Sequence, residues 1–276
     1  MISYLLVCSF WKIVLRDHVE QRRKYAKTVT FFAKIILWYT NTKLTVKNMP
    51  PLDQPFLMVG NHLGIMDIMM VAATRNVLFI TSVEMKNTPL LGTLAEMGGC
   101  LFVERRNRSQ MHKEIEMIRM ALKQGFNVVL FPEGTSTNGQ GLLPFKKSLM
   151  TAAAGTGVPI LPMVLNFTHV NGEKMNWKWR DHVFWYGDHT FTTWILKAMS
   201  LKEVRAEIEF LEPMVCHSEE ERRHITNMAQ AQIEKKFIPV PLGPGEISSF
   251  KMPESLARLT PTQDQDLGPR GSTNLL

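Results

Sequence analysis

Short apolar runs and amphipathic stretches alternate through the middle of the chain, from residue 43 to about residue 240. Apolar runs bounded by turn residues predict buried strands at 45–47, 56–59, 77–82, 100–104, 127–131, 158–165 and 204–210. Helical spacing of apolar residues predicts helices at 67–74, 89–97, 109–123, 149–155 and 218–237. Strands that alternate with helices are typical of an α/β fold, so we expect a mixed, mostly parallel sheet flanked by helices.

The first 42 residues have a different pattern. Two apolar segments, 1–15 and 29–39, lie on either side of a basic stretch that contains Arg16, Arg22, Arg23, Lys24 and Lys27. Two short hydrophobic helices around a basic hinge are typical of a hairpin that lies in one membrane leaflet, with its cations on anionic headgroups. A helical cap on a soluble core is the alternative. Each segment is short for a bilayer span, and the first lacks the features of a signal peptide.

Two later regions are less regular. Residues 166–200 contain Trp177, Trp179, Trp185 and Trp194 among histidines and lysines, which fits either an interfacial aromatic belt or a loop packed on the core. Residues 241–276 are rich in Pro, Gly, Ser and Gln and have no apolar periodicity, so we expect this tail to be disordered. The pattern therefore divides the chain into a two-helix N-terminal motif at 1–42, an α/β domain at 43–240 and the tail at 241–276.

Charge and composition narrow the kind of partner. The formal net charge is +7 and the pI is near 9.3, which favours nucleic acid or acidic lipid. No zinc-finger, RNP or helix-turn-helix signature accompanies that charge, and six Trp with 18 Met favour the lipid. The three cysteines form no CxxC pair, which indicates structural thiols in a reducing compartment.

The strongest chemical signal follows the predicted strand at 56–59. A Gly60-Asn61 turn leads to His62, and Asp67 follows at the start of a predicted helix, where a carboxylate accepts backbone N–H bonds. If the chain doubles back, Asp67 can hold one imidazole nitrogen and leave the other free to take a proton. This is the base-and-orienter half of a Ser-His-Asp triad without an enzyme nucleophile. A turn histidine beside a helix N-cap is the alternative reading.

Other charged residues also follow predicted strands. His62, Arg105 and Glu133 each lie just past one, so their loops are expected to converge on one cleft at the carboxyl ends of the strands. Arg105 stands in a cluster with Arg106 and Arg108 that can fork onto a phosphate, although a solvated loop would look the same. The segment 158–162 carries two prolines, which predicts an edge or irregular strand.

Four stretches in this order resemble the blocks of the PlsC-type glycerolipid acyltransferase family, which includes lysophosphatidic acid acyltransferases. The H-x4-D block falls on His62 and Asp67, and the G-x-x-F-x-x-R block on Gly99, Phe102 and Arg105. The F-P-E-G-T block covers 131–135 and the V-P-x-x-P block covers 158–162. The resemblance extends over roughly residues 45 to 240, and four ordered blocks are specific where a single one is not.

The resemblance implies transfer of a fatty acyl group from acyl-CoA or acyl-carrier protein to the hydroxyl of a lysolipid, without metal or cofactor. His62 would be the general base, oriented by Asp67. The acceptor site would include Asn61, Arg105, Glu133, Gly134, Thr135 and Ser136. The acyl site would be lined by Val158, Pro159 and Pro162. The basic, apolar N-terminus would mount the enzyme on an anionic membrane surface, on the cytoplasmic face of a bacterial inner membrane.

One position departs from the family pattern. Members that form phosphatidic acid usually have Arg after Glu-Gly-Thr, where this chain has Ser136. The change resembles the branch that acts on lyso-ornithine lipid or on larger lysophospholipids, although Arg106, Arg108, Lys146 or Lys147 can substitute as the cation. Lysophosphatidic acid is nevertheless the first expectation for the acceptor, because it is the commonest in the family.

Three other functions are weighed against this one. A serine hydrolase would have to use Ser136, but the surrounding sequence lacks the final glycine of a nucleophile elbow. A non-catalytic membrane-binding protein would not need His62. A nucleic-acid binder fits the charge and leaves the four blocks unexplained, so no nucleic-acid partner is expected.

Overall fold

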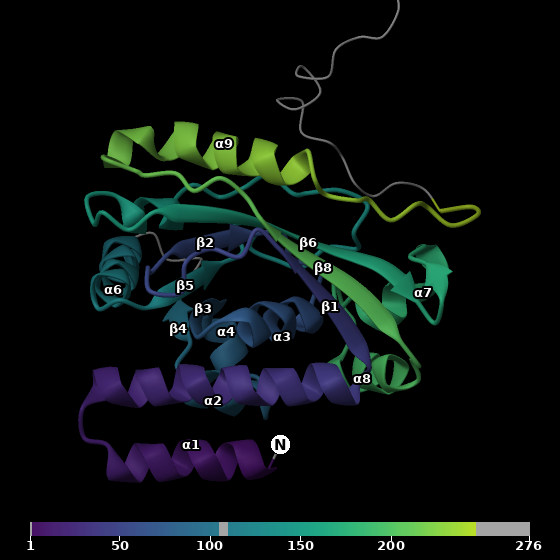
Figure 1. The fold of residues 1–276 in the computed structure, drawn as a ribbon, viewed down its shortest axis with the longest axis horizontal. Coiled ribbons are helices and arrows are strands. Elements are labelled where there is room, and N and C mark those ends of the chain that lie inside the picture. Colours follow the sequence, from purple (N-terminus) through teal and green to yellow (C-terminus); the bar gives the residue numbers. More distant parts are fainter. Residues whose placement is uncertain (1, 105–109, 247–276) are drawn as a thin grey trace, which may run out of the picture.

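A single mixed sheet forms the centre of the protein (Figure 1). The computed structural model describes residues 2–104 and 110–246. The strands are β1 (Thr42–Lys47), β2 (Leu57–Gly60), β3 (Val77–Ser82), β4 (Leu101–Val103), β5 (Asn127–Leu130), β6 (Ile160–Val170), β7 (Glu173–Lys174) and β8 (Val204–Phe210). Their order is β1-β8-β6-β2-β5-β3-β4, with β7 paired to β6. The strands from β6 to β4 are parallel, whereas β8 pairs with β6 antiparallel. The predicted α/β fold with a mostly parallel sheet is confirmed.

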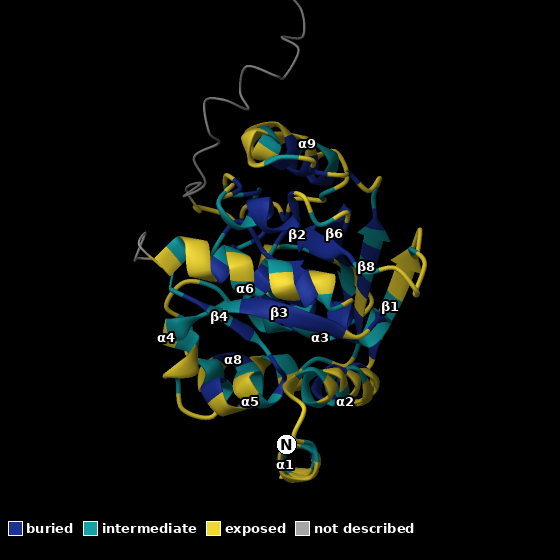
Figure 2. Ribbon diagram, turned by 90° about the vertical axis from the view of Figure 1, so that its left-hand side faces the viewer, coloured by how far each residue is buried: buried dark blue, intermediate teal, exposed yellow. Residues whose placement is uncertain are grey.

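Helices cover both faces of the sheet. They are α1 (Ile2–Val14), α2 (His18–Tyr39), α3 (Ile65–Thr74), α4 (Val83–Lys86), α5 (Leu91–Met97), α6 (Met111–Lys123), α7 (Trp177–Val183), α8 (Phe191–Met199) and α9 (Arg222–Glu234), with 3-10 turns at Leu149–Ala153 and Glu219–Glu221. One core cluster takes its helical residues from α6 and α9 and from Ala26 of α2, and the other takes them from α2, α3, α7 and α8. Figure 2 shows buried strands between these two helical layers.

The central position of strand β2 explains why its sequence is uniformly apolar. All four of its residues are buried, because β5 pairs with one edge and β6 with the other. Leu57 and Val59 point into the first core cluster, and Met58 points into the second. A strand that is buried on both faces reads as a continuous apolar run. The position of β2 therefore places the loop that follows it at the middle of the sheet's carboxyl edge.

The N-terminal hairpin is real, but the predicted basic hinge is wrong. Helix α2 begins at His18, so Arg22, Arg23, Lys24 and Lys27 belong to its first half. Asp17 ends the turn after α1, because its Oδ1 accepts a hydrogen bond from Val19 N at 2.7 Å and caps the helix. Helix α1 lies against α2 as the outermost layer (Figure 1). Within the described residues, no helix combines the length and apolar character needed to cross a bilayer.

The strand that carries two prolines is not at an edge. β6 lies between β8 and β2, at the centre of the sheet. Pro162 is tolerated there because its nitrogen points toward the chain that follows β8, where regular pairing has stopped. On the same side of β6, the Pro162 carbonyl accepts from Leu211 N at 2.9 Å, and Ile160 bridges Met214. The local irregularity was predicted, but the edge position was wrong.

In the remaining regions, the predicted elements agree only in part with the structure. The tryptophan-rich stretch is more regular than a loop, because it contains the end of β6, β7 and two helices, with Trp194 buried in the core. The interfacial belt stays a prediction. The predicted helix at 149–155 is a 3-10 turn, and the one at 218–237 forms regular α-helix only from Arg222 to Glu234. The tail's predicted disorder lies largely outside the described residues. The three domain boundaries stay predictions.

Candidate active site

The loop between β2 and α3 brings His62 and Asp67 together. Asp67 is the third residue of α3, and its carboxylate reaches back over the first turn of the helix. His62 Nδ1 lies 2.9 Å from Asp67 Oδ2, and the same oxygen accepts hydrogen bonds from the amides of Leu63 and Gly64. Asp67 is fully buried. The carboxylate therefore fixes both the loop and one nitrogen of the imidazole.

The other side of the imidazole remains accessible. The His62 ring stacks on Phe131, with centroids 4.1 Å apart and an interplanar angle of 7°. The His62 side chain keeps 19% of its surface exposed. Because Nδ1 is held by Asp67, Nε2 is the nitrogen available to a substrate, and no hydrogen bond to Nε2 is found within the described residues. The pair can thus receive a proton at Nε2 and stabilise the resulting imidazolium.

Glu133 lies in the turn after β5, the strand beside β2 in the sheet, and supports this loop. Its Oε1 accepts from His62 N and its Oε2 accepts from Leu143 N, both at 2.8 Å. The side chain is 2% exposed. Burial raises the pKa of Glu133 to about 8, and the nearby charge of Asp67 acts in the same direction, whereas the two amide bonds lower it. Both oxygens are used on backbone amides, so the geometry makes Glu133 a positioning residue for His62.

A segment far along the chain closes the site. Trp185 N donates to Leu63 O at 3.0 Å, and Trp185 O accepts from Ser136 Oγ at 2.6 Å. The main chain of Trp185 thereby joins the loops that follow β2 and β5. Gly64, at φ +154°, makes this approach possible, because a Cβ there would lie 2.5 Å from Trp185 N. Sequence reasoning did not assign Trp185 to the site; its place in a tryptophan-rich stretch was the only signal.

Comparison with known proteins shows which family the chain belongs to. An acyltransferase family model, described as "Acyltransferase", matches residues 41–166. A "Lyso-ornithine lipid O-acyltransferase" of Brucella abortus is 30% identical over 65% of this chain and 70% of its own length. The chain belongs to the PlsC-like acyltransferase family. A "1-acyl-sn-glycerol-3-phosphate acyltransferase" of Haemophilus influenzae is 31% identical over 61% of this chain and 72% of its own.

Two further comparisons qualify the match. A "Lyso-ornithine lipid O-acyltransferase" of Rhizobium meliloti is 29% identical, and the match spans 66% of this chain and 65% of that relative's length. The crystal structure of an LPA acyltransferase, PlsC, from Thermotoga maritima aligns with a TM-score of 0.56 over 83% of this chain and 86% of that one. At 22% identity, this structural likeness supports the fold alone.

The family's acceptor residues are only partly gathered at His62. Asn61 is fully buried, and its side chain bonds both Leu165 O at 3.0 Å and Leu165 N at 2.8 Å, so both of its polar atoms tie the loop to β6. In the turn beyond Glu133, Gly134 is half-buried and Thr135 is exposed. Arg105, the predicted phosphate anchor, lies outside the described residues.

The fourth family block is not brought to His62. Val158 and Pro159 precede β6 at its amino end, where Pro159 O accepts from Leu57 N at 3.0 Å. Parallel strands rise about 3.3 Å per residue, so this point is roughly 15 Å along the strand from His62. Pro159 instead lines a hollow of about 740 Å³ together with Phe56 and Phe210. Pro162 is buried within β6 opposite Val59, and an acyl-lining role for these residues stays a prediction.

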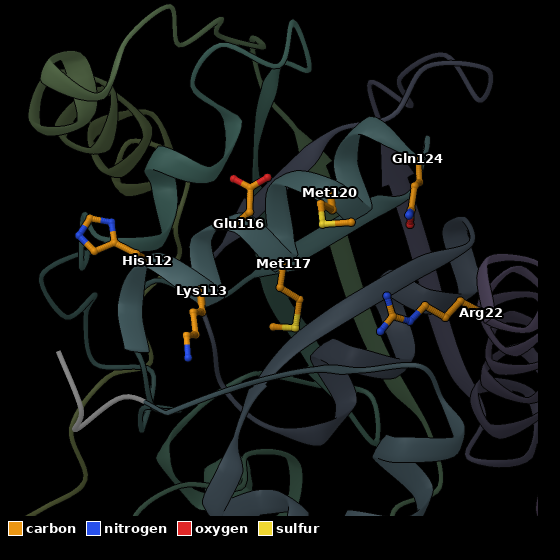
Figure 3. Close-up of a pocket in the computed structure, with 7 residues that line it drawn as sticks. All are labelled: Arg22, His112, Lys113, Glu116, Met117, Met120 and Gln124. Carbon is orange, nitrogen blue, oxygen red and sulfur yellow. The ribbon is translucent and has the colours of Figure 1, made fainter. Parts of the chain in front are cut away.

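A second hollow is also separate from the site (Figure 3). It has a volume of about 520 Å³ and lies between α2 and α6. Arg22 reaches it from α2, whereas Lys113 and Met117 reach it from α6. Of the predicted site residues that the structure describes, none lines this hollow. Across residues 2–104 and 110–246, no group of three His, Cys, Asp or Glu side chains is arranged to hold a metal ion.

Proposed function

We propose that this protein transfers a fatty acyl group from a thioester donor to the free hydroxyl of a lysolipid, with His62 as general base. The observation that carries the proposal is the pairing of His62 Nδ1 with the buried carboxylate of Asp67 at 2.9 Å, which leaves Nε2 accessible. Membership of the PlsC-like acyltransferase family supports the reaction class.

The reaction follows from this geometry. The acceptor hydroxyl donates its proton to His62 Nε2 as its oxygen attacks the thioester carbonyl, which gives a tetrahedral intermediate. The intermediate then expels the thiolate, and the imidazolium returns the proton to the sulfur. Asp67 stabilises the imidazolium while it exists. No acyl-enzyme forms in this scheme, because the nucleophile is the substrate's own hydroxyl.

The competing serine-hydrolase mechanism receives little support from the position of Ser136. Its hydroxyl donates to Trp185 O at 2.6 Å and so serves the contact between the two loops. The partner recorded for His62 Nδ1 is Asp67, and no contact between His62 and the Ser136 hydroxyl is found among the described residues. We therefore assign Ser136 a structural role in the loop.

For the acceptor we propose lyso-ornithine lipid first and lysophosphatidic acid second. Relatives named for the former are similar at 29% and 30% identity, and the Ser136 substitution supports that branch. Lysophosphatidic acid was the first expectation from the sequence. It remains a specific alternative, because the relative from Haemophilus influenzae, named for that acceptor, is 31% identical.

We also propose that the protein works on an anionic membrane surface, on the cytoplasmic face of a bacterial inner membrane. The hairpin supports contact with a membrane surface through the exposed apolar side chains of Leu6, Phe10 and Ile13 on α1 and of Trp38 on α2. Apolar side chains beside a cationic stretch suit the boundary between headgroups and acyl chains.

The deciding experiment is acyl transfer by the detergent-purified full chain. Labelled acyl-CoA and acyl-carrier protein would each be offered with lyso-ornithine lipid or lysophosphatidic acid. We expect His62→Ala to lower the rate by about 10² to 10⁴. His224→Ala, a change at an exposed histidine of α9, should leave it unchanged. Equal rates for wild type and His62→Ala would reject the base assignment. Absence of transfer by the wild type would favour the non-catalytic membrane-binding alternative.

A further inference from the structure

The turn after β5 lacks the side-chain cation that the family pattern usually has at position 136. Ser136 does not compensate directly, because its hydroxyl is held by Trp185 O at 2.6 Å. An acceptor with an anionic group needs a counter-charge near the hydroxyl that reacts. The described part of the chain offers such a charge at a neighbouring point of the same turn.

That charge is the ammonium of Lys146. Lys146 N donates to Pro132 O at 2.9 Å, which anchors the lysine backbone beside the turn. A Cβ built on Gly134 would lie 2.5 Å from Lys146 Nζ and 3.1 Å from its Cε. The ammonium therefore occupies the space that a side chain at position 134 would fill. Gly134 also has φ +78°, a conformation that glycine adopts without strain.

The ammonium lies close to the proposed base. Gly134 N bonds Phe131 O at 3.1 Å, so the two residues are the ends of one tight turn. The His62 ring stacks on Phe131 at 4.1 Å. Ends of such a turn have Cα atoms within about 7 Å, which places the ammonium and the imidazole on the order of 10 Å apart. A lysolipid that presents its hydroxyl to His62 can thus extend its headgroup to Lys146.

No carboxylate neutralises this lysine in the described structure. The nearest acidic residue in the turn is Glu133, whose two oxygens bond the amides of His62 and Leu143. The ion pairs found among the described residues do not include Lys146. Lys146 is also exposed, so its charge is available to a ligand that approaches from solvent. Lysine is a point charge with three donors, so it accommodates a phosphate or a carboxylate.

We propose that Lys146 binds the anionic headgroup of the acceptor lysolipid and so replaces the cation that Ser136 lacks. The inference deepens the proposed acyl transfer and rests on it. The chemistry that Lys146 recognises is an oxyanion a few bonds from the acceptor hydroxyl. This description fits the phosphate of lysophosphatidic acid and the carboxylate of lyso-ornithine lipid, but it excludes an uncharged monoacylglycerol.

The test compares Lys146→Met with Lys146→Arg and with Lys147→Met, an equally exposed lysine next in the chain, in the full-length protein. Two quantities are measured for each variant. The first is the dissociation constant for each lysolipid in the absence of donor. The second is the set of KM values for acceptor and for acyl-CoA. Lysophosphatidic acid, lyso-ornithine lipid and monoacylglycerol serve as the three acceptors.

The expected pattern is specific to the anion. Lys146→Met should weaken binding of an anionic acceptor and raise its KM about ten- to a hundredfold, the range for loss of one charge-assisted hydrogen bond. The KM for acyl-CoA and any turnover of monoacylglycerol should not change. Lys146→Arg should retain most of the affinity, and Lys147→Met should behave as the wild type. The larger of the effects on the phosphate and the carboxylate acceptor identifies the native headgroup.

A rescue variant distinguishes a lost charge from a lost fold. Adding Ser136→Arg to Lys146→Met puts a cation where the family pattern has one and removes the Ser136 bond to Trp185 O, so it should recover only part of the affinity for the anionic acceptor. The inference is overturned if Lys146→Met and Lys147→Met have equal effects, or if only the KM for acyl-CoA rises. If the wild type binds the anionic acceptor through Lys146 but transfers nothing, the headgroup assignment holds and the proposed function fails. If it neither binds nor transfers, both fail.

Discussion

At the scale of single residues, Glu133 shows most clearly how burial in the site changes the protonation of a side chain. This carboxyl group is 2% exposed, lies beside the buried Asp67 and holds the backbone of His62. Burial is the main reason that its pKa rises to about 8, from 4.5 in an unfolded chain. In the native state Glu133 therefore keeps its proton over a pH range in which the unfolded chain loses it.

This difference predicts a pH-dependent stability. Because the folded pKa is the higher one, the stabilisation is complete below pH 4.5 and is lost as pH rises toward 8. Between these limits the free energy of unfolding should fall, relative to that of Glu133→Gln, by an amount on the order of a few kcal/mol. Denaturant unfolding of both proteins at several pH values checks this. Parallel pH profiles would contradict the raised pKa.

At this scale the sequence predicts the charged pair better than its neighbours. His62 and Asp67 are found because a histidine in a turn and a carboxylate in a first helical turn are local signals. The roles of Asn61 and Ser136 depend on where their side chains point. One faces Leu165 and the other faces Trp185, both far away along the chain. No local pattern carries that information.

Among the elements, the N-terminal hairpin shows what apolar spacing misses. Its two helices are expected from the two apolar segments, but the start of α2 is set by Asp17 and not by hydrophobicity. The Asp17 carboxylate caps the helix through Val19 N, and the basic residues behind it become helical. A cap depends on one side chain and its short-range hydrogen bonding, so the spacing of apolar residues does not indicate where the helix begins.

The cap predicts a local effect of Asp17→Ala. Loss of this capping bond should cost about 1 kcal/mol of helix stability, confined to the first turn of α2. Hydrogen exchange of the amides after Asp17 should therefore accelerate about fivefold, since roughly 1.4 kcal/mol corresponds to tenfold. Asp188→Ala, at an exposed turn position, provides the comparison. Unchanged exchange in that turn would show that the helix start does not depend on the cap.

Strand β6 gives the opposite lesson. Its prolines favour an edge, yet it is central, because Pro162 faces the chain just beyond β8, where the regular register has ended and Leu211 N bonds only the Pro162 carbonyl. The alternation of apolar runs was enough to predict β3 and β8 over 77–82 and 204–210. The order of strands in the sheet was not predictable in the same way, since it depends on contacts between distant segments.

On the scale of the whole molecule, one surface differs from the rest. Helix α1 exposes Ile2, Leu6, Phe10 and Ile13, with exposed fractions of 72%, 65%, 54% and 82%. These positions recur at helical spacing, so they form one stripe along α1. The opposite side of α1 is held to the protein by Tyr4, whose hydroxyl donates to Leu94 O at 3.0 Å, and by Cys8 in the same small core. An apolar stripe on an anchored helix is suited to a lipid surface.

The proposed membrane contact predicts the behaviour of a triple variant, Leu6→Ser, Phe10→Ser and Ile13→Ser. Each side chain that leaves the acyl boundary should cost on the order of 1 kcal/mol, so binding to anionic phospholipid vesicles should weaken about a hundredfold. Co-sedimentation with the vesicles measures this. The melting temperature should stay close to that of the wild type, because the residues that anchor α1 are unchanged.

A matched control separates a membrane face from general surface hydrophobicity. Leu52 and Ile238 are exposed to a similar extent, at 71% and 53%, but lie outside the hairpin. The double variant Leu52→Ser and Ile238→Ser should bind vesicles as the wild type does. If both variants lose binding equally, the attraction is not specific to the hairpin. If neither loses binding, the basic residues of α2 hold the protein on the anionic surface, and added salt should then release it.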